Sequence, residues 1–330
     1  MKKVLSIILS VAIIFTLTAC NSSKPASKDA GGDSKTPKSV TITTLNGKRE
    51  AIQLEVPYNP KRLAVMDLGA LDIIDKLELG DRMVGVSKGS SIEYLQSYLN
   101  NQSFVNLGTV RKAKLEAVVE CNPDVIIIGP RLLEFYDELI KIAPVICLST
   151  DTKQGVVKST NKNAMLLASL FGKEDKIAAM MAGYDNRIKT LASFAKGKTA
   201  VICMANAGGI GILGNNGRCS LIGVEVGFKN SGIGTNIDTS VHGNEASFEF
   251  LVSVNPNYIF IMDRDAAIGT KGAKLAKDIM DNELIRLTSA YKNGNIVYLE
   301  HSNVWYMAEG GITALGIMLS DLEEGLFKTK

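Results

Sequence analysis

Two segments of the chain share one pattern of apolar and polar positions. LEAVVECNPDVIIIGPR occupies residues 115–131, and FEFLVSVNPNYIFIMDR occupies residues 248–264. Both have Glu at the second place, Asn-Pro at the eighth and ninth, and Arg at the last. Before Asn-Pro the apolar residues keep helical spacing, and proline ends a helix. After it they form a continuous run, which is typical of a strand buried on both faces of a parallel sheet. Each copy therefore predicts a helix, a turn and a buried strand.

An arginine directly follows each of these predicted strands. Open α/β sheets bind their ligands outside the carboxyl ends of the strands. Arg131 and Arg264 therefore predict two similar α/β lobes, each of which directs one arginine at a shared cleft. The alternative is a chance similarity between two common helix–strand units, which identical spacing at four positions disfavours.

Other segments extend the same scheme. In the first half, Leu63–Met66 predicts a strand, followed by a helix that ends near Gly80 and a strand at Met83–Val86. In the second half, KTAVICMA at 198–205 predicts a strand, and the helix after it closes at Gly227.

The two halves are joined by a segment with strong helical character. Residues 173–197 contain no proline and only one internal glycine before the last position, and their apolar residues keep helical spacing. At 1.5 Å per residue this helix is long enough to cross from one lobe to the other, which predicts a stiff hinge. The sequence thus predicts an α/β fold of two Rossmann-like lobes (40–172 and 197–330), joined by one long helix (173–196), with a ligand cleft between the lobes.

The first residues predict export rather than structure. A basic MKK precedes a short apolar run, and LTAC at 17–20 resembles the lipobox of bacterial lipoproteins. This resemblance implies a signal peptide over 1–19 and a lipid on Cys20, which anchors the protein on the extracytoplasmic face of the cell membrane. The polar residues 20–39 predict a flexible tether. An ordinary secretory signal with an incidental cysteine is the alternative.

Composition narrows the functional classes. The formal charge of +3 is small and the lysines are scattered, so nucleic acid is not an expected partner. Four cysteines remain besides Cys20, without a CxxC pair, and we expect them to be small buried apolar residues; an extracellular disulfide stays open. They are Cys121, Cys147, Cys203 and Cys219.

Several motifs together resemble a known class of protein. VPYNPKRLAVMD, both repeat copies, GPRLLEFYDELIKIAP, VHGNEASFEF, IMDRDAAIG and YLEHSNVWYMAEGG are similar to substrate-binding lipoproteins of ABC importers for iron–siderophores. Within that class they resemble the ferric-catecholate, petrobactin-type subgroup. The resemblance implies a monomer that binds a ferric catecholate siderophore, needs no cofactor, catalyses no reaction and delivers its ligand to an ABC permease dimer. Haem or cobalamin binding, or an exported enzyme, are the alternatives.

The resemblance also implies the ligand-binding residues. Arg131, Arg218 and Arg264 match the arginines of a basic cleft, with Lys88 at its rim and Trp305 as a further ligand-binding residue. Guanidinium groups suit an anionic catecholate because they supply fixed forks of donors and remain charged. For any single arginine the alternative is a solvated surface position.

Iron ligands are the next candidates. The chain has only two histidines, which argues against an importer of bare zinc or manganese. The resemblance implies that His242 and Tyr306 coordinate iron when the siderophore is tetradentate and leaves two positions open. The alternatives are an exposed loop histidine and a core tyrosine.

The glutamates of the repeat have a separate implied role. In the class, such a pair meets arginines of the permease, which assigns permease docking to Glu116 and Glu249. The alternative is an ordinary acidic residue in the first turn of a helix, where the helix dipole favours negative charge.

One motif favours a different function and is rejected. GIGILG at 209–214 fits the G-x-G-x-x-G dinucleotide pattern, but its Ile210, Ile212 and Leu213 predict an extended segment, and the turn NNG follows instead of a helix. No catalytic motif of the hydrolase or metalloprotease type is present.

Overall fold

A five-stranded parallel sheet forms the first lobe. The structure is a computed structural model, and it describes residues 37–151, 154–233 and 243–327. The strand order is β5-β4-β3-β8-β9, with bounds β3 Leu63–Val65, β4 Met83–Val86, β5 Val105–Asn106, β8 Val125–Ile128 and β9 Val145–Cys147. Every residue of β3, β8 and β9 is buried, as expected for parallel strands covered on both faces.

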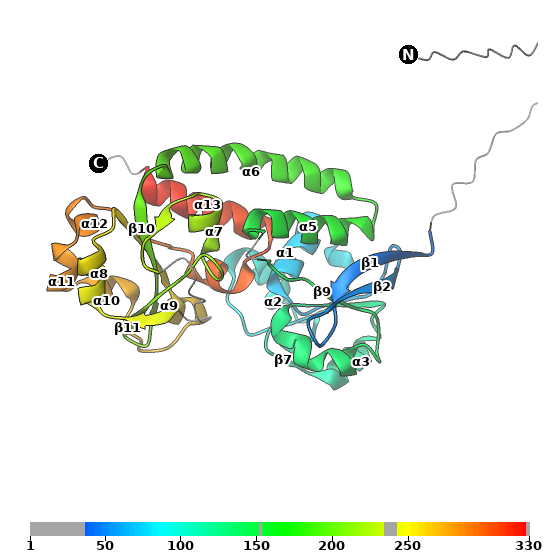
Figure 1. Cartoon of the computed structure of the whole chain (residues 1–330). Helices are drawn as coiled ribbons and strands as arrows, with labels where there is room; N and C mark the ends of the chain where they lie inside the picture. The colour runs from blue at the N-terminus through cyan, green and yellow to red at the C-terminus, as the bar shows by residue number, and fades with distance from the viewer. Residues whose placement is uncertain (1–36, 152–153, 234–242, 328–330) are drawn as a thin grey trace, which may run out of the picture. The chain divides into compact units, whose positions relative to one another are not determined.

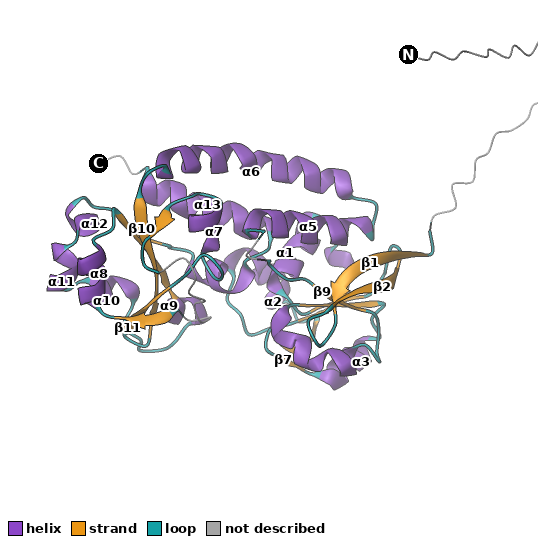
Figure 2. Ribbon diagram, in the orientation of Figure 1, coloured by secondary structure: helices purple, strands orange, loops and turns teal. Residues whose placement is uncertain are grey.

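The second lobe is built on a six-stranded sheet. Its parallel part comprises β10 Thr199–Asn206, β12 Lys229–Asn230, β14 Tyr258–Asp263 and β15 Ile296–Tyr298. The antiparallel strands β11 Gly209–Ile212 and β13 Asn244–Ala246 extend it on the side of β10 away from β14. Figure 2 shows the strands of each lobe with helices beside them. The two-lobed α/β fold predicted from the sequence is confirmed.

Short elements complete both lobes. The hairpins are β1 Ser39–Leu45 with β2 Ala51–Pro57, and β6 Gly108–Thr109 with β7 Lys112–Ala113. The shorter helices are α1 Leu68–Lys76, α2 Gln96–Leu99, α4 Tyr136–Leu139, α7 Ser220–Val224, α9 Arg264–Ile268, α10 Ala276–Met280, α11 Glu283–Leu287 and α12 Ser289–Lys292. No helix among the described residues is long and apolar enough to cross a bilayer.

The repeated sequence pattern is a repeated structure. Helix α3 (Leu115–Cys121) leads into β8, and α8 (Phe248–Val254) leads into β14. Asn122 and Asn255 end these helices in the left-handed conformation, with φ of 43° and 46°, a conformation that asparagine tolerates better than most residues. The proline that follows prevents either helix from continuing. Both predicted helix–strand units are confirmed.

One long helix links the lobes, and a second long helix packs against both of them. Helix α6 (Glu174–Ala195) is the predicted linker, and Figure 1 shows it lying along α13 (Ile312–Leu326) and α5 (Val156–Ser169). Although α13 belongs to the second lobe by sequence, it packs against α1, α5 and α6. One hydrophobic core consequently contains residues of both lobes, from Ile42 to Leu322. The chain from Pro37 onward forms a single compact unit, so the lobe boundaries stay a prediction.

Two carboxylates bind helix N-termini across the lobe boundary. Asp72 of the first lobe accepts hydrogen bonds from the backbone N–H groups of Thr313 and Ala314 at the start of α13, both at 2.9 Å. Glu225 of the second lobe accepts one from the N–H of Val157 in the first turn of α5, at 2.8 Å. Each carboxylate satisfies donors that a helix cannot satisfy internally, and its charge suits the helix dipole.

The contact of Asp72 is enclosed on all sides. Its side chain is fully buried, and it also accepts from the hydroxyl of Tyr94 at 2.7 Å. Burial raises the pKa of Asp72, an effect that the hydrogen bonds from α13 and Tyr94 oppose. A Cβ atom at Gly311 would lie 2.3 Å from the carboxylate oxygen Oδ2, which leaves room only for glycine.

Replacing Asp72 by alanine should lower the free energy of unfolding by about 2–3 kcal/mol, because the N–H groups of α13 and the hydroxyl of Tyr94 lose a buried acceptor. Urea unfolding measures this. Asp75→Ala is the matched control, since Asp75 lies on the same helix, is half-buried, and accepts from Tyr98 within the first lobe. Equal losses in both variants would contradict a special role for the contact between the lobes.

Candidate functional site

A cavity of about 330 Å³ lies between the lobes. The first lobe contributes Asp67 and the segment Gly129–Arg131 to its lining. The second contributes Asn216–Arg218, Tyr306, Met307, Glu309 and Gly310. Arg131 follows the end of strand β8, and Arg218 lies in the loop between β11 and α7. The predicted cleft between the lobes is therefore present, and its size is in the range of small-molecule sites.

Three arginines surround one tyrosine ring in this cleft. The guanidinium carbon of Arg218 lies 4.1 Å from the ring centroid of Tyr306, and those of Arg131 and Arg264 lie at 5.8 and 6.0 Å. Arg131 also donates from Nη2 to the carbonyl oxygen of Tyr306 at 3.2 Å. These distances allow cation–π attraction. The structure thus brings together four of the residues that the sequence assigned to the site.

The charges of this cluster act on one another. Burial alone would raise the pKa of Tyr306, but a hydrogen bond from Arg264 and the positive charges of Arg218, Arg264 and Arg111 outweigh it, so that the pKa is lowered. The pKa of Arg131 is lowered by burial and by the charge of Arg218, and Asp67 partly offsets this. The cluster therefore favours a negative group at its centre.

Sequence reasoning missed two polar residues of the first lobe. The Nη2 atom of Arg111 lies 3.5 Å from the hydroxyl of Tyr306, and no local pattern marks this residue, since a hairpin turn carries it to the cleft. Asp67 follows β3 by two residues and receives the N–H of Ala70 at 2.9 Å. The rule that indicated Arg131 and Arg264, a polar residue at a strand end, would also have found Asp67.

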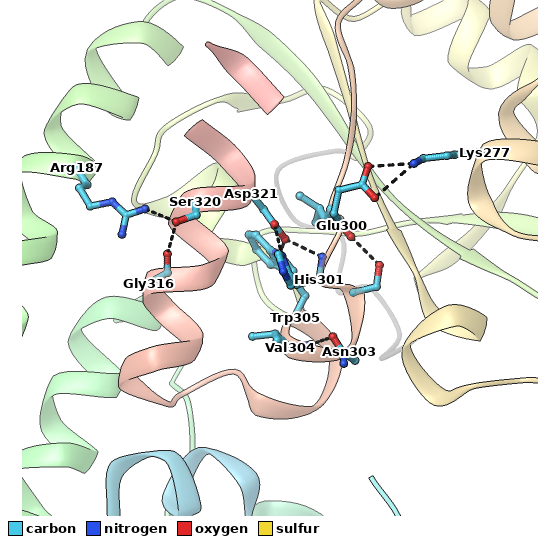
Figure 3. A network of polar contacts seen from close by, with 12 residues as sticks. Arg187, Lys277, Glu300, His301, Asn303, Val304, Trp305, Gly316, Ser320 and Asp321 are labelled. Carbon is cyan, nitrogen blue, oxygen red and sulfur yellow. Dashed lines mark hydrogen bonds and ion pairs between the residues drawn. The ribbon is translucent and has the colours of Figure 1, made fainter. Parts of the chain in front are cut away.

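The π-helical turn Val304–Ala308 places Tyr306 in the cleft. Figure 3 shows how this turn is held: the buried carboxylate of Asp321 on α13 accepts from the indole Nε1 of Trp305 at 2.8 Å. The same carboxylate accepts a hydrogen bond from the backbone N–H of His301 at 3.1 Å, and its second oxygen is hydrogen-bonded to Nδ1 of His301 at 2.6 Å. Tyr306 itself is 2% exposed, so its position is closely defined.

The structure corrects two of the predicted ligand contacts. Trp305 is fully buried and its N–H is bonded to Asp321, so its indole packs in the core and does not face the cleft. Lys88 does not line the cavity, and its Nζ donates to the carbonyl of Asn101 at 2.7 Å. The packing around Trp305 places its indole away from the expected surface.

The other predicted residues lie elsewhere. Glu116 and Glu249 are exposed in the first turns of α3 and α8. Cys20 and His242 lie outside the described residues. Within the described ranges no group of three or more His, Cys, Asp or Glu residues could hold a metal ion. The four described cysteines are buried and free, as expected from their apolar surroundings, and GIGILG enters strand β11 rather than a helix.

The chain belongs to the periplasmic binding protein family, whose model matches residues 63–302. This confirms the family predicted from the sequence motifs.

Individual relatives agree with this assignment. The petrobactin-binding protein YclQ of Bacillus subtilis is 32% identical over 99% of this chain and 100% of its own length. Its crystal structure has a TM-score of 0.80, covering 88% of this chain and 100% of that one. The catecholate-siderophore binding protein VctP of Vibrio cholerae is 31% identical, with a TM-score of 0.77 and coverage of 86% and 99%. The ferric-anguibactin-binding protein FatB of Vibrio anguillarum is 26% identical over 83% of this chain and 84% of its own length. The matched family and these relatives are binding proteins rather than enzymes.

Asp321 should control the environment of Trp305, the single tryptophan of the chain. In Asp321→Ala the indole N–H loses its acceptor, so we expect the fluorescence emission to shift to longer wavelength and the free energy of unfolding to fall by about 1–3 kcal/mol. Ser320→Ala is the control on the same helix, because Ser320 bonds to Arg187 and Gly316 and does not contact the indole. Unchanged emission in Asp321→Ala would refute this role.

Proposed function

We propose that this protein is an extracytoplasmic binding protein that captures a ferric siderophore of the catecholate type and delivers it to an ABC permease. The observation that carries the proposal is the group of arginines from both lobes around one cavity. Two relatives that cover 99% and 86% of this chain are named for petrobactin and catecholate siderophores, which supports the same ligand class here.

The chemistry of the cleft suits such a ligand. A ferric catecholate is anionic, and its oxygens surround the metal, so guanidinium groups can meet it from several directions. Arg131 and Arg218 repel one another in the empty cleft, and an anion between them relieves that repulsion. Guanidinium planes also pack favourably on aromatic rings, as Arg218 already does on Tyr306.

Delivery to a permease requires the protein to stay near the membrane. The sequence LTAC provides a lipid attachment site at Cys20, and the polar residues 20–39 provide the length for a tether. A lipid on Cys20 therefore holds the binding protein on the extracytoplasmic face of the membrane, next to the permease.

Arg131→Ala and Arg264→Ala should each weaken binding of a ferric catecholate by about 1.5–3 kcal/mol, the scale of hydrogen bonds to charged groups. Lysine should restore affinity only in part, since an ammonium cannot reproduce the guanidinium fork. Isothermal titration calorimetry gives the affinities, and the exposed Arg286→Ala on α11 is the control. Wild-type affinity in both cleft variants, or a wild-type protein that binds only haem or cobalamin, would overturn the proposal.

Direct coordination of iron is proposed for Tyr306 and His242. A tetradentate siderophore leaves two iron positions open, and the lowered pKa of Tyr306 favours the phenolate that iron prefers. The hydroxyl lies 3.5 Å from Nη2 of Arg111 and accepts a hydrogen bond from Arg264, so coordination requires both contacts to give way to the metal. With a ferric bis-catecholate, Tyr306→Phe and His242→Ala should change the visible charge-transfer band, whereas a tris-catecholate should give the same band in all three proteins. Bands unaltered by both substitutions would exclude coordination.

Permease docking is proposed for Glu116 and Glu249. Each lies exposed in the first turn of an equivalent helix, so the repeat places one carboxylate on each lobe. Reversing both charges to lysine should abolish uptake of the ferric siderophore by cells and leave its affinity for the isolated protein unchanged. Charge reversal at Glu55 and Glu283, which are also exposed, is the matched control. Normal uptake by the Glu116/Glu249 double variant would disprove the assignment.

A further inference from the structure

Glu309 is an acidic residue in a cleft otherwise dominated by arginines. It lines the cavity, and its Oε1 atom is buried with no hydrogen-bond partner among the described residues. Glu225 nearby shows the same feature at Oε2, while its Oε1 is held by the N–H of Val157. A buried ionised oxygen without a donor is unfavourable, so this site is poised to take a proton.

The charges that act on Glu309 come from both lobes. Arg218 and Arg131 favour its ionised form, and Glu225 disfavours it. Asp67 lines the same cavity and interacts with Arg131, and Lys158 acts on Glu225. Burial is the largest influence, and together these effects raise the pKa of Glu309 to about 7. A substantial fraction of the empty protein therefore carries an ionised Glu309 at neutral pH.

An anionic ligand changes this balance in one direction. Its negative charge repels the carboxylate of Glu309, and it occupies Arg131 and Arg218, the two guanidinium groups that had favoured ionisation. Both effects disfavour the charged form of a buried carboxylic acid. By thermodynamic linkage, a group that gains a proton on binding makes binding weaker as the pH rises.

We propose that Glu309 is the internal counter-ion of the empty cleft and takes up a proton from solvent when an anionic ligand binds to Arg131 and Arg218, so that ligand binding and protonation of Glu309 are coupled. The inference rests on the proposed function for the charge of its ligand. The carboxylate gains one proton and becomes a neutral carboxylic acid, with no other bond made or broken. The ionised form of Glu309 offsets the repulsion between Arg131 and Arg218. The neutral form no longer does so, and both guanidinium charges then interact with the ligand.

The test is calorimetry of a preformed ferric tris-catecholate complex at pH 7 in buffers of different ionisation enthalpy. A hexadentate ligand leaves no iron position for Tyr306, so proton release from the phenol does not enter. The dependence of the observed enthalpy on the buffer gives the number of protons exchanged. Since Glu309 is partly ionised in the empty protein, the wild type should take up a fraction of a proton more than Glu309→Gln. Glu283→Gln, an exposed carboxylate on α11, should match the wild type.

A second measurement uses the wild type alone and so does not depend on the folding of a variant. Above pH 7 the affinity should fall by up to about tenfold per pH unit, and it should level off below pH 6. Binding without net proton uptake, or with the same uptake in Glu309→Gln, would overturn the role of Glu309 and leave the proposed function intact. Absence of any binding would instead count against the proposed function itself.

Discussion

The geometry of the cleft depends on the hydrogen bonds that Asp72 and Glu225 make to helix N-termini across the lobe boundary. They fix the starts of α13 and α5, and α13 in turn carries Asp321, which holds the π-helical turn of Tyr306. Helix α13 thus connects the polar contacts at the interface between the lobes with the turn that carries the ring of Tyr306. The linker helix α6 joins the lobes covalently, but the shared core around α13 determines how they face each other.

This rigidity allows the protein to hold like charges close together. Arg131 is partly buried beside Arg218, an arrangement that a flexible cleft would relax by moving the side chains apart. Here the scaffold keeps them on the ring of Tyr306, with Asp67 and Glu309 as the nearby negative groups. Preorganised donors cost no rearrangement when the anion arrives, which is the general advantage of a rigid electrostatic site.

The sequence predicted the parts of this site that depend on local pattern. Arg131 and Arg264 could be found because each follows a helix–turn–strand unit. The hydrophobic periodicity and the proline of that unit can be recognised in the sequence. Arg111 and Glu309 could not, because a hairpin and the packing of the Tyr306–Gly310 loop bring them to the cleft. Trp305 was assigned wrongly because it adjoins Tyr306, which faces the cleft. Sequence adjacency does not show that the π-helical turn directs the indole of Trp305 into the core. Lys88 was assigned to the rim of the cleft by the resemblance, and no pattern indicated its bond to Asn101.

The packing of α13 against both lobes has a consequence for the rate of ligand import. We infer that lobes that share one hydrophobic core hold the carboxylates of Glu116 and Glu249 at one separation, whether the cleft is empty or filled. Under the proposed function, empty copies occupy the permease as readily as loaded ones and act as competitive inhibitors of import. The rate of import then follows the ratio of loaded to empty copies, so that excess binding protein slows uptake when the ligand is scarce.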